Sequence, residues 1–395
     1  MPHYKYLIIG GGMTADAAAG GIREVDAKGS IGIISDEKDS PYDRPPLTKG
    51  LWKKDKTVKS ISRHTGKKGV RLHLGRTIKK IEPKKKRVFD DAKNSYTYDK
   101  LLLATGGRPR LLPFGQKDII YYRNLNDYRR LRGATKKGKQ FVVIGSGFIG
   151  SEIAAALAMN QKQVTMVFPG KNICERLFPA DLALFLNGFY QGKGVQLVAG
   201  ENAAGLKKSG KELILKTSSG RKLPAAAVIA GVGIVPNVEL AQAAGLEVDN
   251  GIIVDEYLRT ADPDIYAAGD VASFFNPALK KRMRVEHEDN ANTMGKLAGR
   301  NMAGKSEPYH HLPFFYSDMF ELGYEAVGEL DSRLETFSDW KTPYREGVVY
   351  YLKKGRVRGV LLWNVWGQVD AARALISKPG PFNPANLKGR LPKKG

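Results

Sequence analysis

The sequence predicts an α/β protein with two Rossmann-like dinucleotide-binding domains and a smaller C-terminal α+β domain that contains an antiparallel sheet. Three observations predict this fold: a glycine fingerprint near the N-terminus, a second one after residue 140, and alternating aromatic and β-branched segments from residue 309 onward. In each fingerprint an apolar strand enters a glycine turn and then an apolar-periodic helix. Such a turn brings the free N–H groups of a helix N-terminus close to a pyrophosphate.

The first fingerprint begins almost at the N-terminus. The apolar strand 6–9 runs into Gly10, Gly12 and Ala15, where alanine in the third place still allows close packing of helix on strand. A helix to about Glu24 and a short strand over 31–34 should follow. One fingerprint alone is a weak signal, because ordinary αβ units also close on glycine turns. Two copies in one chain indicate a flavin nucleotide facing a nicotinamide nucleotide.

Polar residues and a proline-rich segment follow the second strand. Asp36 lies where an acid accepts hydrogen bonds from a ribose diol, although it could also be an ordinary turn residue. The segment 41–49 reads PYDRPPLTK. Because prolines fix φ, we expect Arg44 and Lys49 to project from a rigid loop.

The second fingerprint has glycine at all three places. The strand 141–144 enters Gly145, Gly147 and Gly150, and apolar periodicity continues to about Asn160. After the next strand, 163–168, an acid normally selects NADH over NADPH. Gly170 and Lys171 stand there instead. We therefore expect NADH as the coenzyme but keep NADPH open.

Composition excludes several classes of protein. The chain has 395 residues, 42% of them hydrophobic, which suffices for two or three domains with their own cores. No apolar run approaches the roughly 20 residues that span a bilayer, and no leader precedes the first strand, so we expect a soluble cytoplasmic protein. Its single cysteine, Cys174, excludes the redox-active cysteine pair of flavin disulfide reductases. We expect no metal site.

Charge is the compositional anomaly. Lysine and arginine number 64 against 40 aspartates and glutamates, which gives a formal net charge of +24. The basic residues fall in short scattered clusters, and a well-solvated surface explains them most simply. An acidic redox protein is the alternative partner, since such a field attracts polyanions. Nucleic acid is less favoured, because no helix-turn-helix or aromatic-interleaved basic stripe is present.

At this point the motifs resemble a known family. The first fingerprint, PYDRPPLTKGLW (41–52), LLLATGGRP (101–109) and IYAAGD (265–270) together resemble two-dinucleotide flavoproteins of the ferredoxin- and rubredoxin-reductase type, whose fold is glutathione-reductase-like. Within that family the chain is most similar to the apoptosis-inducing factors, through RVEHEDNA (284–291), PYHHLPFFYSD (308–318) and GVLLWNVW (359–366). The resemblance covers nearly the whole chain.

The resemblance implies three domains and two cofactors. FAD is expected on a discontinuous domain, 1–125 and 251–308, and NAD(P)H on the domain 126–250. A C-terminal α+β domain should cover 309–378, with 379–395 as a flexible tail. The apoptosis-inducing factors carry a long regulatory insertion where this chain has only residues 337–347. A second, regulatory nicotinamide site is therefore not expected.

The resemblance also assigns residues to FAD. Asp270 is similar to the aspartate that accepts hydrogen bonds from the flavin ribityl chain. His287, at the start of a helix, would be a flavin-side contact or an exposed cap, and Tyr316 would stack near the isoalloxazine or belong to the core. The set expected around FAD is Gly10, Gly12, Ala15, Asp36, Arg44, Lys49, Ala104, Thr105, Gly106, Gly269, Asp270, His287 and Tyr316.

A smaller set is implied for NAD(P)H. Phe148 would shield or stack on the nicotinamide, although a phenylalanine inside a fingerprint is often a core residue. The set expected around NAD(P)H is Gly145, Gly147, Phe148, Ile149, Gly150, Glu152, Gly231 and Gly233.

Lys49 and Glu152 form the candidate catalytic pair. The resemblance places them as an ion pair beside flavin N5, where a cation favours the anionic reduced flavin and the carboxylate holds the cation in place. Alternatively, Glu152 interacts only with its helix dipole and Lys49 is a surface residue.

Two functions remain open from the sequence. In the first, hydride passes from NAD(P)H to FAD and electrons then leave to an external acceptor such as a ferredoxin-like protein or a quinone. In the second, the chain is a redox-sensing module similar to an apoptosis-inducing factor, whose NADH-reduced state controls homodimerisation or partner binding.

Overall fold

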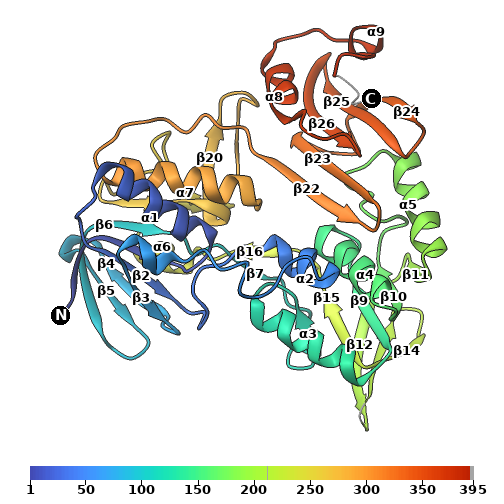
Figure 1. The fold of residues 1–395 in the computed structure, drawn as a ribbon, viewed down its shortest axis with the longest axis horizontal. Coiled ribbons are helices and arrows are strands. Elements are labelled where there is room, and N and C mark those ends of the chain that lie inside the picture. Colours follow the sequence, from blue (N-terminus) through green and yellow to red (C-terminus); the bar gives the residue numbers. More distant parts are fainter. Residues whose placement is uncertain (211, 392–395) are drawn as a thin grey trace. The chain divides into compact units, whose positions relative to one another are not determined.

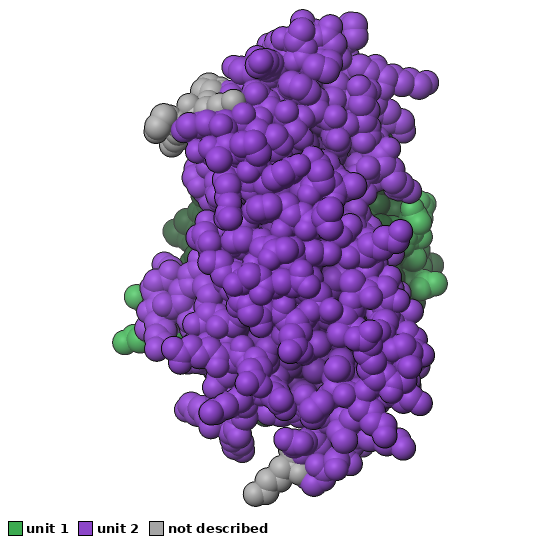
Figure 2. Space-filling model, turned by 90° about the vertical axis from the view of Figure 1, so that its right-hand side faces the viewer, with its two compact units in different colours: residues 1–44, 58–108, 235–313 green, residues 45–57, 109–234, 314–395 purple. Residues whose placement is uncertain are grey.

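The computed structural model describes residues 1–210 and 212–391. Within them the chain forms two units, coloured green and purple in Figure 2. The first comprises Met1–Arg44, Val58–Arg108 and Val235–Pro313, and the second comprises Pro45–Thr57, Pro109–Ile234 and the chain from Phe314 onward. Both units are assembled from separate stretches of sequence.

The first unit is built on a seven-stranded sheet in the order β3-β2-β1-β6-β5-β4, with β19 paired to β6 (Figure 1). Five of these strands are parallel, whereas β4 and β5 form an antiparallel edge. The predicted strand–turn–helix and the strand after it are confirmed. The strands are β1 (His3–Ile9), β2 (Ile31–Ser35), β3 (Val70–Leu74), β4 (Ile78–Glu82), β5 (Arg87–Asp90), β6 (Ser95–Leu103) and β19 (Ile265–Ala267), and the long helices are α1 (Met13–Val25) and α7 (Glu288–Met302).

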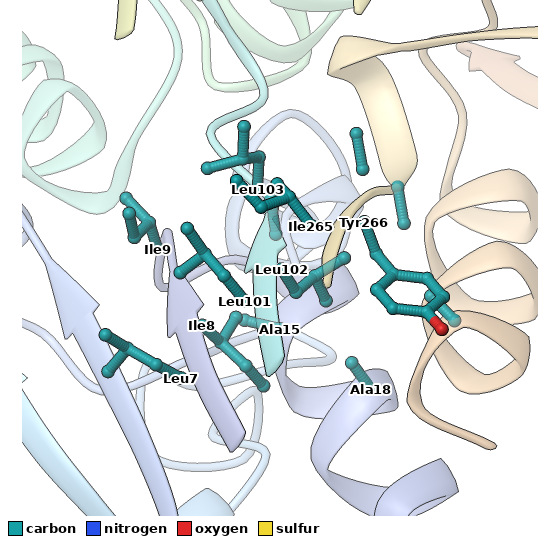
Figure 3. Packing of buried hydrophobic residues seen from close by; sticks show 14 of the residues in the cluster. Leu7, Ile8, Ile9, Ala15, Ala18, Leu101, Leu102, Leu103, Ile265 and Tyr266 are labelled. Atoms are coloured by element: carbon teal, nitrogen blue, oxygen red, sulfur yellow. The ribbon is translucent and has the colours of Figure 1, made fainter. Parts of the chain in front are cut away.

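Apolar side chains fill the centre of this unit. Leu7 of β1, Leu102 of β6 and Ile265 of β19 are fully buried in adjacent parallel strands. Ala15 and Ala18 of α1 pack against them, as Figure 3 shows. Strands covered on both faces are expected to read as continuous apolar runs rather than as alternating ones. This explains why the final residues of β1 (Leu7 to Ile9) and of β6 (Leu101 to Leu103) are recognisable in the sequence.

Helices α1 and α7 lie side by side and meet backbone to backbone (Figure 1). A Cβ atom added to Gly299 of α7 would lie 2.0 Å from the carbonyl oxygen of Ala18, and one added to Gly295 would lie 2.5 Å from that of Thr14. Side chains at these two positions would therefore push the helices apart.

The second unit contains a parallel sheet in the order β11-β10-β9-β15-β8 and a C-terminal antiparallel sheet in the order β22-β23-β26-β25-β24. Both sheets are as predicted. The parallel strands are β8 (Ile119–Tyr121), β9 (Gln140–Ile144), β10 (Gln163–Phe168), β11 (Val195–Ala199) and β15 (Ala227–Ala230). The antiparallel strands are β22 (Phe314–Met319), β23 (Leu322–Gly328), β24 (Glu335–Thr342), β25 (Glu346–Lys353) and β26 (Arg356–Trp363).

Helices and smaller sheets complete the two units. The second unit has α2 (Gly50–Lys53), α3 (Leu125–Lys137), α4 (Phe148–Met159), α5 (Ala180–Gly192), α8 (Val369–Ser377), and the hairpin strands β12 (Ala203–Ser209), β13 (Glu212–Thr217) and β14 (Lys222–Ala225). The first unit adds α6 (Glu239–Ala243), β17 (Val248–Asp249), β18 (Gly251–Ile253), β20 (Ala272–Asn276) and β21 (Lys281–Met283). None of the helices in the described part of the chain is long and apolar enough to cross a membrane.

Residues 379–391 differ from the predicted flexible tail. They contain a short helix, α9 (Pro384–Leu387), whose N-terminus is capped by Asn383. Leu387 and Leu391 are buried, and the Gly389 N–H donates to Asp339 Oδ2 of β24 at 2.7 Å. The Pro, Gly and Lys content suggests disorder, whereas burial of these two leucines favours a fixed position. Residues 392–395 of the predicted tail lie outside the described residues.

The contact between α1 and α7 predicts the effect of a single methyl group. Gly299→Ala should lower the free energy of unfolding by about 1–3 kcal/mol, because a Cβ cannot fit against the Ala18 carbonyl. Gly188→Ala is the matched control, since this helical glycine of α5 is exposed and faces open space. The control substitution should raise the free energy of unfolding by up to about 1 kcal/mol, because alanine has a higher helix propensity than glycine. Urea-denaturation midpoints measure both, and a Gly299→Ala variant as stable as the control contradicts the account.

Candidate active site

The turn after β1 has a shape that requires glycine. Gly10 has φ of +117°, and a Cβ there would lie 2.1 Å from the carbonyl oxygen of Ala104, at the end of β6. Gly12 is the N-cap of α1, and no described side chain caps the N–H groups of that helix end. The atoms nearest to a Cβ added to Gly12 would belong to the Arg44 guanidinium, 3.8 Å away. Free N–H groups beside a cation suit a bound pyrophosphate.

The turn after β9 repeats this arrangement in the second unit. Gly145 has φ of +105°, and its Cβ would lie 2.4 Å from the carbonyl oxygen of Gly231, at the end of β15. Gly150 packs on the same turn, since its Cβ would lie 2.2 Å from the Gly145 carbonyl oxygen. Gly147 is the N-cap residue of α4, and no described side chain accepts a hydrogen bond from the N–H groups of this helix end. A Cβ added to Gly147 would face open space. The two units therefore carry two equivalent glycine turns, at Gly10–Ala15 and at Gly145–Gly150, whose shape suits a dinucleotide and which we call dinucleotide cradles.

Arg44 is held beside the first cradle by an acid that sequence reasoning missed. Its guanidinium pairs with the carboxylate of Glu37, which also accepts a hydrogen bond from the Tyr42 hydroxyl at 2.6 Å. Asp36, the predicted ribose-binding residue, is exposed at the end of β2. The only sequence signal for Glu37 is that it directly follows Asp36.

A second part of the first unit approaches the same helix end. Gly269 has φ of +78°, and a Cβ there would lie 2.2 Å from the Thr14 hydroxyl oxygen of α1. Asp270 follows Gly269, three residues after the end of β19, at the carboxyl edge of the sheet where ligands bind in such folds. The turn Ala104–Gly106 is tied by Asn237, whose N–H donates to Gly106 and whose side-chain amide donates to the Thr105 carbonyl at 2.8 Å.

His287 is the N-cap residue of α7 and is half-buried. Burial lowers the pKa of its imidazole to about 4, although the carboxylates of Asp270 and Asp289 oppose the shift. The side chain is therefore neutral near pH 7 and able to donate or accept a hydrogen bond. The electrostatic interaction also indicates that His287 and Asp270, both predicted FAD residues, lie near each other.

Lys49 and Glu152 meet in the second unit. The Lys49 ammonium lies 2.7 Å from Glu152 Oε1, and their side chains are only 12% and 4% exposed. The carboxylate also accepts hydrogen bonds from the hydroxyls of Ser317 at 2.6 Å and Thr48 at 2.5 Å. Three donors satisfy this buried carboxylate and fix its orientation. The predicted ion pair is thus present, although its role toward a flavin stays a prediction.

Aromatic rings flank this pair within the same unit. The Lys49 ammonium lies 5.4 Å from the centre of the Tyr316 ring. Phe148, half-buried at the start of α4, packs edge-to-face on Phe315 at 5.4 Å. Ile149 beside it is 38% exposed. The structure therefore brings Lys49, Glu152 and Tyr316 together with Thr48 and Ser317. The sequence reasoning missed the last two, although each directly adjoins a predicted residue.

Gly231 and Gly233 line the edge of the second cradle. A Cβ on Gly231 would lie 2.8 Å from the Gly150 backbone nitrogen, so that the start of α4 can approach the end of β15 this closely only because residue 231 is glycine. Gly233 has φ of +94°, and its carbonyl accepts a hydrogen bond from the Arg110 N–H at 2.9 Å. Among the residues with described positions, no cluster of three His, Cys, Asp or Glu side chains could hold a metal ion.

Comparison with known proteins identifies what this arrangement is similar to. Residues 4–295 match the family model described as pyridine nucleotide-disulphide oxidoreductase. Residues 298–343 and 337–378 match the model described as apoptosis-inducing factor, mitochondrion-associated, C-terminal. The two matches together reach from residue 4 to residue 378.

Individual relatives span most of the chain. Apoptosis-inducing factor 1, mitochondrial, of Dictyostelium discoideum is 36% identical over 420 residues, covering 95% of this chain and 78% of the relative. The 5,5′-dehydrodivanillate O-demethylase ferredoxin reductase subunit of Sphingobium is 32% identical and covers 95% of this chain and 94% of the relative. The covalent putidaredoxin reductase–putidaredoxin complex has a TM-score of 0.89 at 29% identity and covers 98% of this chain and 95% of that one.

The buried ion pair predicts a large loss of stability when half of it is removed. Glu152→Ala should lower the free energy of unfolding by about 3–5 kcal/mol, because it leaves the Lys49 ammonium buried without its carboxylate. Glu321→Ala is the control: it removes the exposed partner of Lys193 and should cost less than about 1 kcal/mol. Urea denaturation compares the two, and equal losses contradict the assignment of a tightly held pair.

Proposed function

The chain belongs to the pyridine nucleotide-disulphide oxidoreductase family, and on that premise we propose that it passes electrons from NAD(P)H to a ferredoxin-type iron–sulfur protein. It is an FAD- and NAD(P)H-dependent flavoprotein oxidoreductase. FAD, when bound, supplies the chemistry that takes hydride from the nicotinamide and passes electrons on to an external acceptor.

The state of Cys174 carries the proposal. It is the only cysteine of the chain, so no redox-active pair can relay electrons. Its thiol is buried, donates to the Ser146 carbonyl at 3.4 Å, and has a pKa that burial raises to about 12. A thiol that stays protonated is neither a nucleophile nor a redox centre. Electrons must therefore leave to an acceptor outside the chain.

An iron–sulfur acceptor is favoured over others by two observations. The Sphingobium relative is named as a ferredoxin reductase subunit, and a similar solved structure holds putidaredoxin reductase together with putidaredoxin. The formal charge of +24 also favours an acidic protein partner, because opposite net charges steer association.

The two cradles have proposed ligands. Gly10, Gly12 and Ala15 would receive the FAD pyrophosphate, with the Arg44 guanidinium neutralising its charge. Gly145, Gly147 and Gly150 would receive that of NAD(P)H, with Phe148 shielding the nicotinamide. The remaining predicted site residues keep the roles that the resemblance implies.

Lys49 is proposed to favour reduction of the flavin electrostatically, while Glu152 positions its ammonium. Lys49→Met removes the charge but retains much of the side-chain length. It should slow flavin reduction by NADH about tenfold to a hundredfold with FAD still bound, as measured by anaerobic stopped-flow absorbance. Lys53→Met is the control, because Lys53 pairs with Asp318 at a partly exposed site. An unchanged rate in Lys49→Met removes Lys49 from the mechanism.

The acceptor is tested directly. Purified protein with bound FAD and excess NADH should reduce an acidic [2Fe–2S] ferredoxin faster than it reduces benzoquinone or oxygen. The rate should fall as ionic strength rises, because screening weakens attraction between opposite charges. Faster reaction with the quinone, or a rate independent of salt, contradicts the proposed acceptor.

A redox-sensing function is the second candidate. The match of residues 298–378 to the apoptosis-inducing factor C-terminal model favours it, as does the Dictyostelium relative. In that case reoxidation of the NADH-reduced protein would be slow with every acceptor, and size-exclusion chromatography would show a homodimer only after NADH addition. If the protein turns over fast and stays a monomer after NADH addition, the redox-sensing function is excluded and the reductase function remains.

Several predictions from the sequence remain part of this proposal. They are the domain boundaries 1–125 with 251–308, 126–250 and 309–378, and the cytoplasmic location. Nucleic acid stays the less favoured explanation of the net charge. Salt-dependent binding of nucleic acid without sequence preference would revive it.

A further inference from the structure

The loop after β10 lacks the acid that a coenzyme-selecting position normally carries. β10 ends at Phe168, and Gly170 stands where a carboxylate would contact the adenosine ribose. The space beside Gly170 is nevertheless filled. A Cβ added to Gly170 would lie 2.1 Å from Glu175 Oε1 and 2.5 Å from Glu175 Cδ. A carboxylate from five positions farther along the chain therefore occupies the place of the missing side chain.

Backbone groups hold this carboxylate from one side. The N–H groups of Lys171 and Asn172 donate to Glu175 Oε2 at 2.7 and 3.2 Å. No group among residues 1–210 and 212–391 donates a hydrogen bond to Glu175 Oε1. One oxygen is thus fixed and the other is available to accept from a ribose hydroxyl. Glu175 is half-buried, so that its negative charge is screened less than that of an exposed acid.

The loop is also tied to the dinucleotide cradle. The Cys174 N–H donates at 2.9 Å to the carbonyl of Ser146, which lies between the first two glycines of the second fingerprint. On the other side, Asn187 of α5 accepts from the Ile173 N–H at 3.0 Å and donates to the Lys171 carbonyl at 3.0 Å. These contacts keep Glu175 at a constant position relative to the turn that would hold the pyrophosphate.

We propose that Glu175 selects NADH over NADPH, its Oε1 accepting a hydrogen bond from the adenosine ribose diol in place of the acid that Gly170 lacks. This inference rests on the proposed use of NAD(P)H. A carboxylate at this point gains a hydrogen bond from NADH and repels the 2′-phosphate of NADPH. Lys171 and Arg176 oppose this selectivity, but both are exposed, so that solvent and salt weaken their effect.

Four variants test the proposal: Glu175→Gln, Glu175→Gly, Gly170→Glu, and the double variant Gly170→Glu/Glu175→Gly. Calorimetry on the FAD-replete protein gives the dissociation constants of ADP-ribose and of its 2′-phosphorylated analogue, neither of which carries a nicotinamide. Stopped-flow gives the rates of flavin reduction by NADH and by NADPH. Glu346→Gln is the control, because Glu346 pairs with Lys341 on the C-terminal sheet.

The unaltered protein should bind ADP-ribose more tightly than the phosphorylated analogue. Glu175→Gln and Glu175→Gly should each reduce that preference at least about tenfold, as expected for loss of a hydrogen bond to a charged group. Gly170→Glu alone should weaken binding, because the new Cβ collides with the Glu175 carboxylate. The double variant should restore the preference, since it returns one carboxylate to the same space. Glu346→Gln should change nothing.

Two results overturn the proposal: a preference that Glu175→Gln leaves unchanged, or a double variant no more selective than Glu175→Gly. Binding of neither ligand overturns the proposal together with the proposed function. Selective binding without electron transfer to an iron–sulfur protein contradicts only the proposed function, because ADP-ribose binding requires no redox chemistry.

Discussion

Each dinucleotide cradle depends on a close approach between a glycine and the carbonyl at the end of a neighbouring strand. Gly10 meets Ala104 in one unit and Gly145 meets Gly231 in the other, at distances where a Cβ would overlap the oxygen. The approach lets a helix begin directly over the sheet with its N–H groups uncapped by side chains. The same backbone solution therefore recurs twice in one chain, each time in a form that suits a dinucleotide pyrophosphate.

The buried ion pair contributes geometry more than stability. Two charges removed from water gain little over a well-packed apolar pair, so their presence indicates a role beyond folding. Glu152 is held by the adjacent residues Thr48 and Lys49 and by Ser317, which come from two distant parts of the chain within one unit. Because Cys174 is buried and protonated, the proposed electrostatic action on a bound flavin is assigned to this pair and not to the thiol.

The sequence predicts the backbone elements well because continuous apolar runs and glycine turns are local signals. It also predicts Lys49 and Glu152, though only through resemblance. It misses Ser317 because its hydrogen bond to Glu152 joins residues far apart in the chain. It misses Glu175 because this carboxylate reaches the space beside Gly170 from another position in the sequence. Composition predicts a flexible tail and cannot reveal that Leu391 lies in a buried site.

The most direct test of the account is an anaerobic reductive titration of the FAD-replete protein with NADH, followed through the visible absorbance of the flavin. A flavin without a partner disulfide takes up one NADH per FAD, whereas a flavin coupled to a disulfide, itself a two-electron couple, takes up two. The account predicts complete bleaching at one equivalent. An endpoint at two equivalents, or no bleaching, would contradict it.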